Sequence, residues 1–155
     1  MTQLERLADI AGLVGQELGV SDWMVIDQER IDAFADATGD HQWIHVDRER
    51  AAKELPSGTT IAHGYLILSL IPMLASPLLE IADVTRTINY GCNRVRYTNM
   101  VPAGSRVRAR RVLKSAEQGS GGTRLVSEIV FEIEGEERPA CVAEIVTVLY
   151  TDAPG

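Results

Sequence analysis

A run of 23 residues, Ser57–Leu79, contains no formally charged side chain, although 24% of the whole chain is charged. From Gly64 onward this run is apolar around the full helical turn, so a helix formed there has no polar face to present to water. Such a helix must be enclosed either by other parts of the protein or by lipid.

The flanks and composition of this run favour burial in protein over a membrane span. It is bounded by Glu54 and Glu80 rather than by the basic residues that anchor membrane helices, and it contains one histidine and two prolines. Pro72 and Pro77 should kink or end the regular helix, because proline lacks the N–H that a helix needs. We therefore predict a buried central helix over 63–79 and no association with a membrane.

After residue 83 the spacing of apolar residues changes from a helical period to a period of two. Four runs with this pattern predict antiparallel strands over 84–150, namely Val84–Tyr97, Ser105–Ala116, Thr123–Glu134 and Pro139–Tyr150. The apolar face of this sheet is the available cover for an apolar helix. The sequence therefore predicts an α+β hot-dog fold, in which an antiparallel sheet is wrapped round one long central apolar helix.

The residues before the central helix complete the predicted domain. Residues 1–14 have apolar side chains at helical spacing and predict an N-terminal helical segment. Asp27 and Gly39 suit the start and the end of a second helix, and the polar residues 40–53 predict an irregular path with a turn of helix at 48–52. We expect 27–56 to overhang the sheet, and 1–155 to form a single domain, since 155 residues are one domain's length.

Charge and cysteine content exclude several classes of function. The net charge of −7 argues against general nucleic-acid binding. Residues 86–114, however, carry seven arginines and one lysine but no acidic side chain, which favours a small anionic ligand. Cys92 and Cys141 lack metal-ligand spacing, and the N-terminus lacks the apolar run of a signal peptide, so we expect a cytoplasmic protein without a metal.

Asp40 and His45 are the first candidates for chemistry. A carboxylate and an imidazole on an irregular segment can hold one water molecule between them, so that one group accepts its proton while the other orients it. Loop capping and surface hydrogen bonding explain the same spacing, and both readings stay open on the residues alone.

His63 and Gly64 stand at the start of the predicted central helix and form the second candidate. The first N–H groups of a helix lack intrahelical partners and carry partial positive charge, so the Gly64 N–H could bind a carbonyl oxygen as an oxyanion donor. Alternatively, Gly64 only permits close packing against the sheet, and His63 only caps the helix.

Two motifs together resemble the MaoC-like dehydratases, also called (R)-specific enoyl-CoA hydratases. They are Ala37–Asp40 followed by His45, and Ile61–Gly64; residues 39–47 are most similar to the nodulation-protein-N-like branch. The resemblance implies a hot-dog fold, usually as a homodimer, for a fatty-acid-metabolising lyase. Its reaction adds water reversibly to a trans-2-enoyl thioester, of coenzyme A or of acyl-carrier protein, and gives the (R)-3-hydroxyacyl thioester without a cofactor.

The resemblance also implies roles for individual residues. Asp40 and His45 correspond to the catalytic pair, the Gly64 amide corresponds to the group that binds the thioester oxygen, and His63 and Gln42 are further substrate-binding candidates. Gln42-Trp43 stands where the family pattern has Asn-Pro, which leaves the acyl-chain range in question.

The basic block supplies candidates for binding coenzyme A. Arginine binds phosphate well, and the period of two places Arg94 and Arg96 on one strand face and Arg106 and Arg108 on another. A solvated outer sheet face is the alternative. Two other functions remain open: a hot-dog acyl-CoA thioesterase, in which Asp40 would activate water toward the carbonyl, and a non-catalytic acyl-thioester-binding accessory protein.

Overall fold

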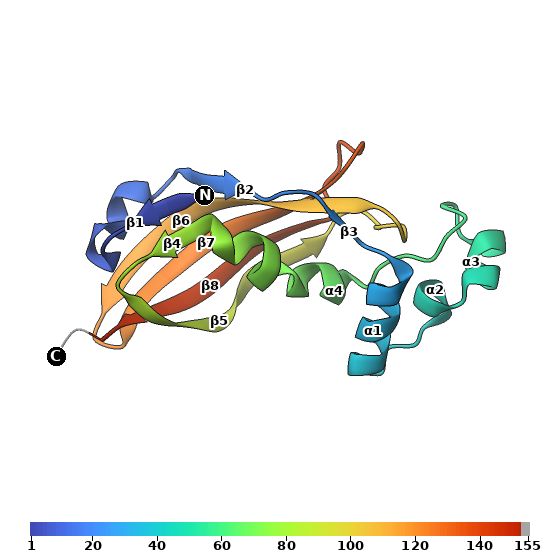
Figure 1. The fold of residues 1–155 in the computed structure, drawn as a ribbon, viewed down its shortest axis with the longest axis horizontal. Coiled ribbons are helices and arrows are strands. Elements are labelled where there is room, and N and C mark those ends of the chain that lie inside the picture. Colours follow the sequence, from blue (N-terminus) through green and yellow to red (C-terminus); the bar gives the residue numbers. More distant parts are fainter. Residues whose placement is uncertain (153–155) are drawn as a thin grey trace.

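An antiparallel sheet forms most of the molecule, and one helical segment runs across a face of it (Figure 1). The computed structural model describes residues 1–152, so the last three residues of the predicted 1–155 domain lie outside the described residues. In chain order the elements are β1 (Thr2–Leu4), the 3-10 helix η1 (Leu7–Leu13), β2 (Glu17–Val20), β3 (Met24–Val25), α1 (Gln28–Thr38), α2 (Trp43–Val46), α3 (Arg48–Glu54), α4 (Gly64–Ser69), the π-helix η2 (Ile71–Ala75), the 3-10 helix η3 (Ser76–Leu78), β4 (Leu79–Ile81), β5 (Val84–Tyr97), β6 (Arg106–Gly119), β7 (Gly122–Ile133) and β8 (Cys141–Thr151).

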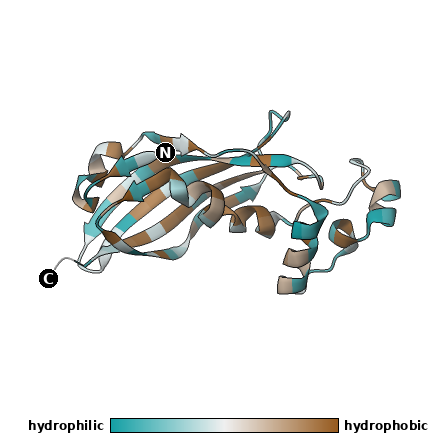
Figure 2. Ribbon diagram, viewed as in Figure 1, coloured by the Kyte–Doolittle hydropathy of each residue, from teal (hydrophilic) through white to brown (hydrophobic). Residues whose placement is uncertain are grey.

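The four long strands follow the predicted period of two. In β7, Leu125, Ile129 and Phe131 are fully buried and alternate with partly exposed residues, which gives the bands of opposite hydropathy in Figure 2. The main sheet has the order β2-β6-β7-β8-β5, and β3 also pairs with β6. The four predicted strands are confirmed, with ends that differ by no more than three residues.

The uncharged run forms a helical path from Gly64 to Leu78 that changes its winding twice. Regular α-helix ends at Ser69, a π-helical turn contains Pro72, and a 3-10 turn contains Pro77. Residues of this path pack in one core cluster with the inner sheet face, among them Leu66, Ile67, Leu70, Leu74, Ala75, Ile129, Phe131, Ala143 and Ile145. The hot-dog arrangement of a sheet around a central helical segment is therefore confirmed.

Part of the central segment faces solvent rather than the sheet. Tyr65 is 70% exposed and Met73 is 52% exposed, whereas the side chains facing the sheet are buried. No helix among residues 1–152 is both long and apolar enough to cross a membrane.

The N-terminus differs from the prediction of a helical segment over 1–14. Thr2–Leu4 forms β1, which pairs in parallel with β4, and only Leu7–Leu13 is helical, as a 3-10 helix. The partner of β1 lies more than 70 residues away in the chain, so local spacing could not indicate it. Leu7 and Ile10 join β4 and the sheet in a second core cluster.

Three short helices extend beyond one end of the sheet and form the overhang, residues 27–56 (Figure 1). Asp27 caps α1 by accepting a hydrogen bond from the Arg30 N–H, and Gly39 ends the helix with a φ of 77°, a left-handed conformation that suits glycine. The segment predicted to be irregular contains α2, which was not predicted, and α3, which agrees with the turn of helix predicted at 48–52. Asp47 caps α3 in the same way as Asp27 caps α1.

Candidate active site

The turn between α1 and α2 positions Asp40 and His45. Asp40 follows the helix-ending Gly39, and its carboxylate accepts a hydrogen bond from the Gln42 N–H at 3.3 Å. His45 lies in α2 and is buried, while Asp40 is half exposed. Asp40 therefore faces water, whereas the side chain of His45 is enclosed by protein.

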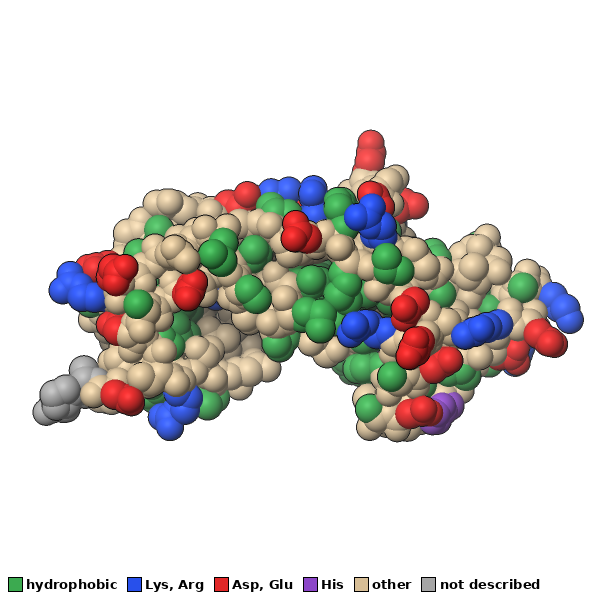
Figure 3. All heavy atoms as spheres, viewed as in Figure 1, with side chains coloured by type: hydrophobic (Ala, Val, Ile, Leu, Met, Phe, Trp, Pro, Cys, Tyr) green, Lys and Arg blue, Asp and Glu red, His purple; other side chains and the backbone are tan. Residues whose placement is uncertain are grey.

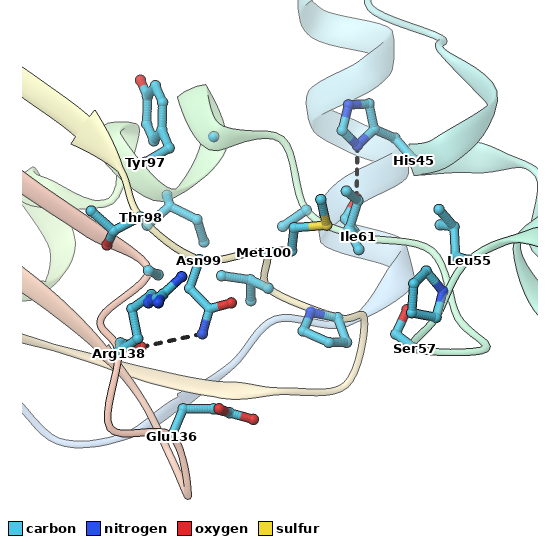
Figure 4. A pocket seen from close by; sticks show the side chains of 17 residues that line it. His45, Leu55, Ser57, Ile61, Tyr97, Thr98, Asn99, Met100, Glu136 and Arg138 are labelled. Carbon is cyan, nitrogen blue, oxygen red and sulfur yellow. Dashed lines mark hydrogen bonds between the residues drawn. The ribbon is translucent and has the colours of Figure 1, made fainter.

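The protonation of His45 follows from its hydrogen bond. Its Nδ1 lies 2.7 Å from the carbonyl oxygen of Ile61, which can only accept, so Nδ1 carries the hydrogen and donates it (Figure 4). Burial lowers the pKa of His45 below its usual 6.5, although the bond to Ile61 opposes this shift. The ring is therefore neutral at pH 7 and has a free lone pair on Nε2.

His63 contacts both members of this pair. Its ring stacks on that of His45, with centroids 3.8 Å apart and planes 23° from parallel, and its other side faces Phe34. Nε2 of His63 donates to the backbone oxygen of Asp40 at 3.0 Å, while its Nδ1 is buried without a partner among residues 1–152. His63, only 2% exposed, therefore fixes the relative position of the other two residues.

One water molecule fits between these groups better than a metal ion does. An oxygen of Asp40 and one nitrogen each of His45 and His63 lie within 4.8 Å of one another, a gap that two hydrogen bonds of about 2.8 Å span. Metal ligands must direct lone pairs at one point, but the rings are stacked and Nε2 of His63 uses its hydrogen toward Asp40. The geometry favours a bound water.

A cavity of about 570 Å³ lies beside the pair, where the overhang meets the end of the sheet (Figure 4). Its lining includes His45, Gly64 and Tyr97 together with apolar side chains such as Ile61, Ile67, Met100 and Val101. Burial raises the pKa of Tyr97 to about 12, so its hydroxyl stays protonated. An apolar cavity with a few polar groups at one end suits a ligand with an acyl chain.

Gly64 begins the central helical segment at the edge of the cavity. As the first residue of α4 it has an N–H without an intrahelical partner, and it lines the cavity. A side chain here would place its Cβ 2.9 Å from Cδ1 of Tyr97, so only glycine fits without movement. The close approach of the Tyr97 ring therefore requires a residue without a side chain at this position.

Gln28 holds the overhang to the central segment, and the sequence pattern did not reveal it. Its amide donates to the carbonyl oxygen of His45 at 2.7 Å, and its carbonyl accepts a hydrogen bond from the hydroxyl of Thr60. The Ile61 N–H donates to the carbonyl oxygen of Ile44 at 3.0 Å. Gln28 of α1 and Ile61, which precedes α4, thus both hold α2.

The structure places the remaining predicted site residues away from the cavity. Gln42 is exposed at the start of α2, and Trp43 lies under Arg50 at 4.0 Å, so neither narrows the cavity. None of the four arginine candidates lines it: Arg106 and Arg108 pair with Glu134 and Glu132, and Arg94 and Arg96 lie on β5.

Arg138 is the arginine that lines the cavity, and sequence reasoning missed it (Figure 4). It lies between β7 and β8, outside the basic block and directly after Glu136 and Glu137. No local pattern distinguishes it, because its position depends on how the β7–β8 connection folds against Asn99, whose side chain donates to the Arg138 carbonyl.

Fold and site together define a hot-dog protein with a carboxylate–imidazole pair and a helix-start amide beside an apolar cavity. A family model described as a MaoC like domain matches residues 9–132. 3-Hydroxyacyl-thioester dehydratase Z of Mycobacterium tuberculosis (strain ATCC 25618 / H37Rv) is 50% identical over 145 residues, which are 93% of this chain and 95% of that protein. Nodulation protein N of Rhizobium leguminosarum bv. viciae is 50% identical over 149 residues, 94% of this chain and 92% of that one.

A solved structure extends the likeness to the fold. The (R)-hydratase from A. caviae involved in PHA biosynthesis superposes with a TM-score of 0.72 at 21% identity, covering 88% of this chain and 96% of that chain. The chain belongs to the MaoC-like dehydratase family and is an enzyme of the hydro-lyase class.

Proposed function

We propose that the protein is an (R)-specific enoyl-CoA hydratase, which adds water reversibly to trans-2-enoyl-CoA and gives (R)-3-hydroxyacyl-CoA. The observation that carries this proposal is the neutral His45, which lines the same cavity as Gly64 and lies close to Asp40, a residue just outside the cavity lining. The similarity to 3-hydroxyacyl-thioester dehydratase Z supports a thioester substrate.

The reaction begins at the thioester oxygen. The Gly64 N–H donates a hydrogen bond to this oxygen, which makes C3 electrophilic and stabilises the enolate that forms. Asp40 orients the water molecule, and Nε2 of His45 removes one proton as the water oxygen bonds to C3 and the C2–C3 π bond opens toward the carbonyl.

The second proton transfer completes the balance. His45 begins neutral and the Asp40 carboxylate is an acceptor, so neither group starts with a proton to give. The proton taken from water is therefore the one returned to C2 of the enolate, and the pair ends in its starting state. No cofactor is required by these steps.

Arg138 is the cation that we assign to the phosphates of coenzyme A or of the carrier-protein arm, because it lines the cavity without a carboxylate partner among residues 1–152. A homodimer joined along β5 would complete the molecule. β5 is an edge strand with exposed Ile88 and Tyr90, and Tyr65 and Met73 expose apolar surface nearby in the helical segment. The two free cysteines fit a reducing compartment such as the cytoplasm.

The experiment that tests the reaction uses purified protein and crotonyl-CoA. Loss of the enoyl absorbance with formation of (R)-3-hydroxybutyryl-CoA, identified by chiral chromatography, is the expected result. Asp40→Asn and His45→Ala should each lose about 10²–10⁴-fold in kcat. Unchanged turnover in both variants would overturn the site.

Thiol release separates the alternative functions. A thioesterase would release free coenzyme A from crotonyl-CoA, whereas hydration releases none. A non-catalytic binding protein would bind acyl-CoA but show neither change, and that result would also contradict the proposal.

A further inference from the structure

A row of polar side chains crosses the inner face of the sheet and divides the core in two. On three neighbouring strands the same order recurs along the inner face: a residue of the first core cluster, then a polar residue, then a residue of the second cluster. The three series are Ala109, Arg111, Leu113 on β6; Ile129, Ser127, Leu125 on β7; and Ile145, Thr147, Leu149 on β8. Inner sheet positions are normally apolar, so this row requires an explanation.

Arg111 is the charged member of this row. It is 6% exposed, and no carboxylate lies within ion-pairing distance of it among residues 1–152. Its Nε donates to the Ser127 hydroxyl at 3.2 Å, and its Nη1 donates to the carbonyl oxygens of Ala75 and Ser76 at 3.3 and 3.5 Å. Burial lowers the pKa of Arg111 to about 10, so the guanidinium remains charged at neutral pH.

These hydrogen bonds leave one end of the guanidinium free. An arginine has five N–H donors, and the two on Nη2 have no protein partner in the described part of the chain. Stabilising the end of the helical segment accounts for Nη1. Nη2 is not a buried atom and so is open to water or a ligand, and the charge has no counter-ion among residues 1–152.

A second cavity of about 310 Å³ opens beside Arg111. Arg111, Thr87, Thr147 and Ser76 line it, together with apolar walls formed by Ile71, Ala75, Leu79, Ile81, Val84, Ile145 and Leu149. Figure 3 shows the molecule hollowed between the positions that β4 and β5 occupy in Figure 1. The volume is several times the ~30 Å³ that one water occupies in the liquid, so a single buried water does not fill it.

This cavity is separate from the catalytic one. The two share no lining residue, and they lie at opposite ends of the central helical segment, at Gly64 and at Ala75–Leu79. Glu80 is the acidic residue in the lining; it is exposed and accepts a hydrogen bond from Gln3. The buried charge of the cavity is therefore positive.

We propose that the Arg111 cavity binds a carboxylate with an apolar tail, such as a medium-chain fatty carboxylate. The carboxylate takes the two free N–H groups of Arg111 and the hydroxyls of Thr87 and Thr147, and the tail lies against the aliphatic walls. This inference does not depend on the hydratase reaction, because no residue of the catalytic pair takes part.

The test uses the intact protein and octanoate labelled with ¹³C in the carboxyl group. Titration should give saturable binding, a shift of the carboxyl resonance and contacts from the octanoate tail to the methyl groups of Ile145 and Leu149. Octanol, which has the same tail and no charge, should bind at least about tenfold more weakly, because charge-assisted hydrogen bonds are lost. Equal binding of octanol, or no contact to these methyl groups, would overturn the proposal.

Variants assign the charge to one side chain. Arg111→Met should lower octanoate affinity about tenfold or more, whereas Arg110→Met, on the outer face of the same strand beside Glu17 and Glu132, should leave it unchanged. Thr147→Leu fills the cavity and leaves Arg111 in place, so it should also abolish octanoate binding. If Arg111→Met does not fold, Thr147→Leu still tests whether octanoate binds in this cavity. Retained octanoate affinity in folded Thr147→Leu would contradict the proposal.

Crotonyl-CoA hydration is the control that separates the two proposals. Thr147→Leu should retain it, and His45→Ala should retain octanoate binding while losing hydration. Octanoate binding that disappears with His45→Ala would place the ligand in the catalytic cavity and refute the second site.

Discussion

The imidazole rings of His45 and His63 are stacked at 3.8 Å, and only one of them lines the catalytic cavity. His63 contacts both residues of the proposed pair. Its ring stacks on the ring of His45, and its Nε2 donates to the backbone oxygen of Asp40. We therefore expect His63 to affect the reaction by positioning His45 and Asp40.

His63→Phe should keep a ring against His45 but lose the hydrogen bond to Asp40. We expect kcat to fall about 10²-fold, because small misplacements of reacting groups have this effect, while KM for crotonyl-CoA changes little. His63 also lowers the pKa of His45, so the acid limb of the pH profile should move to higher pH. His41→Ala is the matched control, since His41 is exposed beside Asp36 and should leave both readouts unchanged.

The pH dependence of hydration should report the titration of His45. Protonated Nε2 cannot accept the proton of water, so kcat/KM should be constant near pH 7–8 and fall as the pH drops through the pKa of His45, which lies below 6.5. Dehydration of (R)-3-hydroxybutyryl-CoA should show the same acid limb, because His45 is neutral at the start and at the end of the reaction. An acid limb above pH 6.5 would contradict the assignment of His45 as the base.

Gly64→Ala should lower the free energy of unfolding by about 1–3 kcal/mol, because the new methyl group overlaps the Tyr97 ring. Denaturant titration measures the change. Gly121→Ala is the control, since a Cβ there meets nothing within 4 Å. In the Tyr97→Ala background the overlap is absent, so adding Gly64→Ala should lower the free energy of unfolding less than it does in wild type. An equal loss in both backgrounds would show that the overlap is not the cause.

Arg138→Gln should raise KM for crotonyl-CoA and leave kcat almost unchanged, since the phosphates that we assign to Arg138 are remote from the reacting carbons. The truncated substrate crotonyl-pantetheine, which lacks the phosphates, should be hydrated equally by wild type and variant. Arg106→Gln removes an arginine already paired with Glu134 and should leave KM unchanged. The opposite ranking of the two variants would restore the basic block as the phosphate site.

Tyr90→Glu should convert the proposed dimer to monomer, because it places a charge on the exposed face of the edge strand β5. Light scattering after size-exclusion chromatography measures the mass. Lys114→Glu, an exposed charge change on β6, should leave the dimer intact. A wild-type protein that elutes as a monomer at micromolar concentration would contradict the dimer directly.

The sequence allowed prediction of those elements whose pattern is local. The alternation of apolar and polar residues predicted both ends of β5 correctly, and Asp27 and Gly39 marked the two ends of α1. β1 was missed because its three residues are a strand only through pairing with β4. α2 was missed because four residues show no helical period.

The candidate site likewise contains residues that local motifs predicted and residues that only the fold could place. Asp40, His45 and Gly64 belong to two short motifs, and the fold brings those motifs together. The arginines were the weakest inference, because a strand pattern says which side chains share a face but not what lies opposite. Arg106 and Arg108 face glutamates of β7, while Arg138 reaches the cavity from a hairpin connection.

The overhang carries Asp40 and His45, the proposed catalytic pair. Its helix α1 packs Ile31 and Phe34 against the main core cluster, whereas α2 is held by hydrogen bonds through Gln28, Ile44 and Ile61. Segments held in this way open at lower free energy than packed strands do. Heating should therefore inactivate the enzyme before the sheet melts, and cooling should restore activity without refolding of the core. The temperature at which activity is lost should thus depend on local unfolding of the short helix α2 rather than on the stability of the main sheet.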